Sequence, residues 1–126
     1  MFVLEFVEAN RFDRAMAKGR TSPLLLAGER RDGSEVELVA KFSAGNGLGV
    51  DGLAREAIGA MLAIDLDLAT PEPYLVRIGV EFVKQVITTS ATSGALLKNS
   101  VPVGFGSRRL PNGYVAWMPG QTATKG

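Results

Sequence analysis

The sequence predicts an α+β fold: a mainly antiparallel sheet with one prominent helix inserted after the third strand. Two observations lead to this fold class. Short runs rich in β-branched and aromatic residues are separated by glycine and proline turn signals, as around 23–28 and 35–42. One longer run, 51–65, instead repeats its apolar residues every three or four positions, which is the period of an α-helix.

The first third of the chain predicts two strands and a loop. Residues 2–8 combine apolar and aromatic side chains with spaced acids, which indicates an opening strand. The polar run 10–22 contains a glycine and predicts a loop. Pro23–Gly28 is apolar almost throughout, so we expect a second strand that is buried on both faces.

A hairpin turn and a third strand follow. Asp32–Gly33 predicts the turn, because glycine supplies the positive φ that tight turns need. In the strand 35–42, alternation places Lys41 on the face opposite the apolar residues. The four residues expected to face the core are Val36, Leu38, Ala40 and Phe42.

The main helix is expected over 51–65, after a glycine-containing loop at 43–50. Asp51 is the predicted N-cap, since its carboxylate can accept hydrogen bonds from the free amides of the first turn. The helix must end before Pro71, because prolines deny the α conformation to the residues before them. The later segments are expected in this order: a strand at 74–76, a strand or short helix at 79–86, a Ser/Thr-rich surface stretch at 88–93, and a hairpin of strands 101–109 and 114–118 around an Asn-Gly turn.

Composition excludes several kinds of chemistry. The 126 residues contain no cysteine and no histidine, which removes thiol nucleophiles, zinc–thiolate sites and the commonest general base. A formal charge of +1 gives no support for nucleic-acid binding, and the paired arginines Arg30–Arg31 and Arg108–Arg109 flank turns, which favours solvated loops. No apolar run is long enough to span a membrane and no basic leader is present, so we expect a cytoplasmic protein of bacterial type. One domain is expected over 1–118, with a polar tail at 119–126.

Lys41 and Glu56 are the strongest candidates for a binding site. A lysine that ends a strand can offer its ammonium to phosphate oxygens, and a helical carboxylate fifteen positions later can fix where that ammonium points. We expect Gly59, Ala60 and Ala63 to let the helix approach the sheet closely. The alternatives are a lysine that faces solvent and a glutamate that is exposed or paired within its own helix.

Two further segments are candidates for the same site. Backbone amides around Gly19 and the hydroxyls of Thr21 and Ser22 can cradle phosphate oxygens, although a plain polar hairpin fits this segment equally well. Met118, next to Trp117, ends the last expected strand and can line an adenine site, although a lone tryptophan at a strand end is more often part of a core.

Several short segments follow one another in an order that matches a known family. They are Gly19–Leu26, Val39–Phe42, Leu53–Ala57, Pro71–Pro73 and Val103–Arg108. Together they resemble the N-terminal lobe of HipA-like kinases. The resemblance implies a protein-kinase-like lobe with a five-stranded sheet and one helix, which binds ATP.

The same resemblance assigns a role to each candidate residue. Lys41 matches the ATP-contacting strand lysine and Glu56 its helix partner, 19–22 matches the phosphate-covering loop, and Met118 falls near the hinge between lobes. The sequence ends before any segment matching the second lobe, which supplies the catalytic aspartate and the Mg²⁺ ligands. We therefore expect ATP binding by this chain alone to be weak or absent, Mg²⁺ to be bound only together with a second lobe, and no phosphoryl transfer. The alternative is a non-catalytic interaction domain that associates with itself or with a separate partner lobe.

Overall fold

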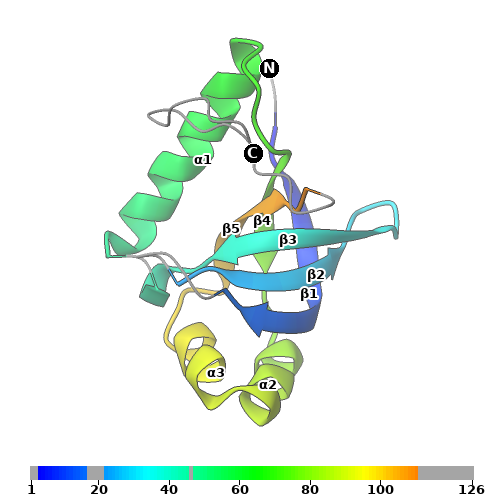
Figure 1. Cartoon of the computed structure of the whole chain (residues 1–126), viewed down its shortest axis with the longest axis vertical. Helices are drawn as coiled ribbons and strands as arrows, with labels where there is room; N and C mark the ends of the chain where they lie inside the picture. The colour runs from blue at the N-terminus through cyan, green and yellow to red at the C-terminus, as the bar shows by residue number, and fades with distance from the viewer. Residues whose placement is uncertain (1–2, 17–21, 46, 111–126) are drawn as a thin grey trace.

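The computed structural model describes residues 3–16, 22–45 and 47–110. Within these ranges, five strands form one closed barrel in the order β1-β2-β3-β5-β4 (Figure 1). Four neighbouring pairs are antiparallel and only β1 and β4 are parallel, so the prediction of an α+β fold with a mainly antiparallel five-stranded sheet is confirmed. The strands are β1 (Glu5–Ala15), β2 (Leu24–Glu29), β3 (Glu35–Lys41), β4 (Pro73–Arg77) and β5 (Val103–Arg108).

Strand β1 is longer than the sequence suggested, and it closes the barrel. Its first residues pair in parallel with β4, from Glu5 opposite Tyr74, whereas its later residues pair with β2 as far as Ala15 opposite Leu24. The predicted loop over 10–22 is therefore wrong in its first half. The register shifts twice along this stretch, and such bulges break the apolar alternation that marks a strand in sequence.

The β2–β3 hairpin forms as predicted. Gly33 has a φ of 89°, and its amide donates to the Arg30 carbonyl oxygen over 2.9 Å. The Asp32 carboxylate accepts hydrogen bonds from the amide and the hydroxyl of Ser34, which holds the turn closed. In β3 the alternation is also confirmed: Val36, Leu38, Ala40 and Phe42 are buried, and Lys41 lies on the other face.

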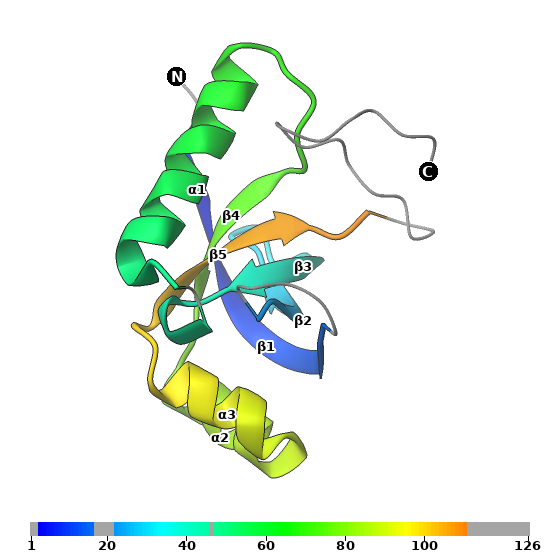
Figure 2. The ribbon, with the colours of Figure 1, turned by 60° about the vertical axis from the view of Figure 1, so that its left-hand side comes forward.

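Three α-helices accompany the barrel in the described part of the chain, where the sequence predicted one main helix. Helix α1 (Gly49–Asp65) lies along the outside of the barrel, and α2 (Val80–Thr89) and α3 (Ala91–Lys98) lie side by side at one end (Figures 1 and 2). The predicted loop before α1 contains a short 3-10 helix, η1 (Ser43–Gly45).

The ends of α1 differ in how they are capped. The helix begins at Gly49 with Leu48 as its N-cap, so Asp51 lies inside the first turn and the predicted N-cap is wrong. A negative charge in that turn still favours the helix through its dipole. At the other end Asp67 adopts a φ of 60°, and the amide of Leu68 donates to the Ala63 carbonyl oxygen over 2.8 Å. This bond satisfies one of the carbonyl groups that the end of a helix otherwise leaves unpaired.

Helices α2 and α3 extend the core of the barrel. The segment 79–86, which the sequence left open between strand and helix, belongs to α2, whose Phe82 and Val86 pack in one cluster with residues inside the barrel. The predicted surface stretch at 88–93 is confirmed for Thr88, Thr89, Ala91 and Thr92, which are exposed, and is wrong for Ser93, which is buried in α3. Serine and threonine in sequence suggest exposure, but here Ser90 caps a helix.

The remaining expectations fall outside the described residues. They are the strand 114–118, most of the Asn-Gly hairpin and the tail 119–126.

Candidate functional site

The structure brings Lys41 and Glu56 together. The Lys41 ammonium donates a hydrogen bond to Oε1 of Glu56 over 2.8 Å, which makes a charged pair between β3 and α1. The two side chains are 26% and 29% exposed, so the pair is half-buried but remains open to solvent on one side. At this distance the glutamate restricts where the flexible lysine can point.

Local structure explains why the pair forms. Lys41 is the last residue of β3 and projects to the outside of the barrel, where α1 contacts β4, β5 and η1. Glu56, Ala60 and Ala63 lie on the half-buried side of α1, as expected. Gly59 does not belong to this side: it is exposed, and a Cβ at this position would meet nothing within 4 Å. The proposed role of Gly59 in close packing against the sheet is therefore wrong, because the helix turns this residue toward solvent.

Apolar side chains surround Lys41 on the same face of the sheet. Phe105 of β5 lies directly opposite Lys41 in the strand register. Val39 is two residues before Lys41 and therefore shares its face, and Leu25 of β2 lies opposite Val39. Phe105 and Leu25 are buried and Val39 is half-buried. A cation beside this apolar surface suits a ligand that has both an anionic group and a flat apolar one.

The segment predicted to cover phosphates connects β1 to β2, and only its two ends lie within the described residues. The Met16 amide donates to the Pro23 carbonyl oxygen over 2.9 Å, which closes the base of the loop between β1 and β2. Leu24 lies opposite Ala40, so this base is next to Lys41 in the register of the sheet. Ser22 is exposed at the base, with a φ of 47°. Gly19, Thr21 and Met118 lie outside the described residues.

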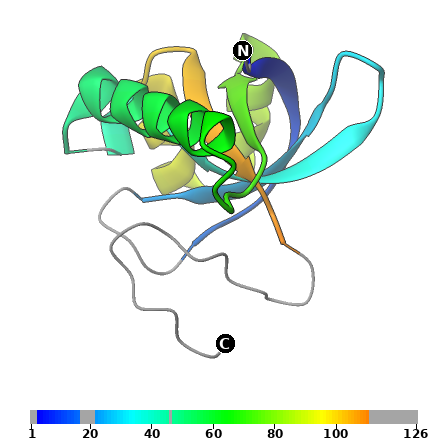
Figure 3. The same ribbon diagram turned by 90° about the horizontal axis from the view of Figure 1, so that it is seen from above.

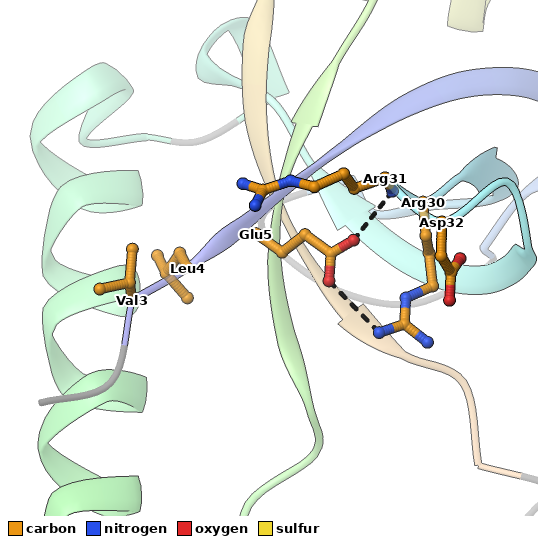
Figure 4. Close-up of a pocket in the computed structure, with 6 residues that line it drawn as sticks. All are labelled: Val3, Leu4, Glu5, Arg30, Arg31 and Asp32. Atoms are coloured by element: carbon orange, nitrogen blue, oxygen red, sulfur yellow. Dashed lines mark hydrogen bonds and ion pairs between the residues drawn. The ribbon is translucent and has the colours of Figure 1, made fainter.

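A second polar region, which the sequence did not single out as a site, lies near the start of β1. An open cavity of about 520 Å³ is lined there by Val3, Leu4, Glu5, Arg30, Arg31 and Asp32 (Figure 4). The Glu5 carboxylate accepts hydrogen bonds from the Arg31 amide over 3.0 Å and from the Arg30 guanidinium over 3.3 Å. The hydrogen bond from the Arg31 amide has the largest effect on Glu5 and lowers its pKa, and the bond from Arg30 lowers it further. Arg30 is half-buried, so the expectation of a solvated loop is wrong for this residue.

The same region contains a buried tyrosine. Tyr74 donates its hydroxyl hydrogen to Glu72, and the Arg30 guanidinium lies 5.8 Å from the centre of its ring. The pKa of Tyr74 is raised to about 12, mainly because the hydroxyl is buried and secondly because it is bonded to Glu72. Tyr74 and Arg30 therefore keep a neutral phenol and a cation together in a single polar cluster. The sequence shows acids and arginines together around this turn, which is a signal for ion pairs. The local pattern does not indicate which acid contacts which arginine.

Comparisons with protein-family models, with curated proteins and with solved structures gave no match. Within the described part of the chain, no helix has the length and apolar character needed to cross a bilayer. Nor does this part of the chain contain a group of three or more acidic side chains arranged to hold a metal ion.

Proposed function

We propose that this chain is the ATP-binding lobe of a HipA-like kinase, and that Lys41 contacts the nucleotide phosphates. The observation that carries the proposal is the 2.8 Å bond between the Lys41 ammonium and the Glu56 carboxylate. Protein kinases need an ion pair of this kind, between a lysine on the third strand and a glutamate on the following helix, for phosphoryl transfer. Here too the lysine ends the third strand and the glutamate lies on the next α-helix.

The residues around Lys41 fit such a ligand. Lys41 would hold phosphate oxygens as a point charge, and Glu56 would keep the ammonium from turning toward solvent. The outer face of β3, with Val39 exposed in part, offers an apolar surface on which a base can lie. Ser22, at the base of the β1–β2 loop, is two residues before Leu24, which pairs with Ala40 next to Lys41, so its hydroxyl is a candidate ligand for the same anion.

Nucleotide binding can be measured as thermal stabilisation of the purified chain. A ligand that binds only the folded state raises the melting temperature, and ligand at about 100 times its Kd adds about 2.7 kcal/mol to the free energy of unfolding. We expect Mg-ATP to raise the melting temperature of the wild-type chain and to have no such effect on Lys41→Ala. Tripolyphosphate, tested alongside, reports how much of the effect needs only phosphates.

Arg77→Ala is the matched control. Arg77 also sits at the end of a strand, and its guanidinium lies 3.0 Å from the Glu8 carboxylate. This variant removes a cation and an ion pair elsewhere on the barrel, so it should keep the full response to Mg-ATP. A wild-type chain that does not respond, or a Lys41→Ala variant that responds equally, would show that Lys41 does not hold nucleotide in this chain.

A further inference from the structure

Helix α1 exposes a row of apolar side chains that the core does not use. We call it the α1 ridge, and its members follow one another at intervals of four residues: Val50, Ala54, Ile58, Leu62 and Leu66. Val50, Ile58, Leu62 and Leu66 are 52%, 58%, 55% and 67% exposed. Side chains four apart form the continuous ridges along which helices pack against one another.

The ridge faces away from the barrel. At about 100° per residue, Ile58 and Leu62 lie on the side of α1 opposite the buried Leu53 and the half-buried Ala60. Figure 2 shows α1 along the outer edge of the molecule, and Figure 3 shows it from above. An apolar row on the free side of a surface helix is unusual, because that side is normally polar.

Two charged residues, Arg55 and Asp65, accompany the ridge. Within the described ranges, neither Arg55 nor Asp65 makes an ion pair or a side-chain hydrogen bond. Both project from the same side of the helix as Ile58 and Leu62. The two pairs are also centred on the same position, Ala60: Ile58 and Leu62 are two residues from it, and Arg55 and Asp65 are five.

This symmetry identifies the surface that fits the ridge. If a second α1 runs antiparallel, with the two-fold axis at the level of Ala60, Ile58 of each copy meets Leu62 of the other. The same operation brings each Arg55 to the level of Asp65 of the other copy. The ridge is thus complementary to itself in both shape and charge, as a two-fold interface requires. Gly59, which has no side chain and open space around it, leaves room for close approach near the axis.

We propose that two copies of this chain associate through their α1 ridges, packed antiparallel, with Arg55 of each copy paired to Asp65 of the other. One helix from each copy makes a small interface, so we expect reversible dimers with affinity in the micromolar range. The surface lies away from the Lys41–Glu56 pair, so dimerisation does not depend on nucleotide binding.

Sedimentation velocity over a series of protein concentrations tests the association. We expect the wild-type chain to shift from monomer to dimer as its concentration rises, and Ile58→Lys to remain monomeric. Val80→Lys is the control, because Val80 is a 70% exposed apolar residue on α2, away from the ridge. Thermal melting of each variant shows that its fold is intact.

Charge reversal tests the antiparallel register. R55D places two acids at each end of the interface and D65R places two bases there, so each variant alone should dimerise at least about tenfold more weakly than the wild type. An equimolar mixture of the two restores both ion pairs in a heterodimer and should recover dimers, as should the double variant R55D/D65R. A local effect on the helix cannot produce this recovery.

Three results would overturn the proposal. They are a wild-type chain that stays monomeric at every concentration, a dimer that persists in Ile58→Lys, and a mixture of R55D and D65R that associates no better than either variant alone. None of these results bears on Lys41, so the proposed nucleotide site is tested separately.

Discussion

Helix α1 and the α2–α3 pair are attached to the same barrel in different ways. The α2–α3 pair continues the core: Phe82, Val86 and Leu97 are buried in one cluster with residues inside the barrel. In α1 only Gly52 and Leu53 are buried, although the helix is the longest one described. Its connection to the sheet includes the Lys41–Glu56 pair, which is half-exposed.

The difference indicates separate tasks. Phe82 and Val86 of α2 and Leu97 of α3 are buried in the core, and this helix pair closes one end of the barrel (Figure 1). The apolar residues of α1 remain largely available, and the helix holds its one glutamate against a strand lysine. A segment that contributes little to the core but positions charged and apolar groups is a good candidate for binding.

The largest expected effect comes from truncating the α2 contact with the core. Phe82→Ala should lower the free energy of unfolding by about 3 to 5 kcal/mol, because it removes a buried aromatic ring and leaves a cavity. Ile58→Ala on α1 should change it by less than about 0.5 kcal/mol in dilute solution. Urea denaturation measures both variants. Similar losses in the two would mean that α1 is part of the core after all.

Two helical glycines provide the next test, with effects of opposite sign. A Cβ at Gly94 in α3 would lie 2.4 Å from Cγ1 and 2.7 Å from Cα of Ile87 in α2, so Gly94→Ala should cost about 1 to 3 kcal/mol. At Gly59 in α1 the space is open, and Gly59→Ala should stabilise the fold by about 0.5 to 1 kcal/mol through better helix propensity. Thermal melting of the two variants side by side shows directly whether each substitution raises or lowers the stability of the fold. A loss at Gly59 would contradict its exposed position.

The smallest expected effect is that of the charged pair itself. Glu56→Gln should lower the free energy of unfolding by less than about 1 kcal/mol, since half-exposed ion pairs are screened by water, and salt should reduce the difference further. Glu8→Gln, which weakens the exposed pair with Arg77, serves as the comparison. If Glu56→Gln proved as damaging as Phe82→Ala, the pair would be a structural element and its proposed role in positioning Lys41 would lose its basis.

The candidate site was predictable in part. Alternation along β3 was sufficient to place Lys41 outside the barrel, and helical periodicity was sufficient to place Glu56 on α1. The contact between them, which the structure shows over 2.8 Å, was only a hypothesis, because the sequence left solvent-facing alternatives open for both residues. The cluster of Arg30 with Glu5 and Tyr74 was missed entirely, since its members come from two strands, β1 and β4, and from the turn after β2, which are distant in sequence.

The amino-acid sequence by itself determined the local structure: the third strand, the Asp-Gly turn, and the helical run that ends at Asp65. These depend on alternation, on a residue that tolerates positive φ, and on the 3.6-residue period, all of which act between near neighbours. Only the tertiary structure decided that β1 runs on past its polar residues, that it pairs with β4 to close the barrel, and that α2 and α3 cover one end. Contacts of this kind depend on which distant segments bury apolar surface together, and no local pattern records that choice.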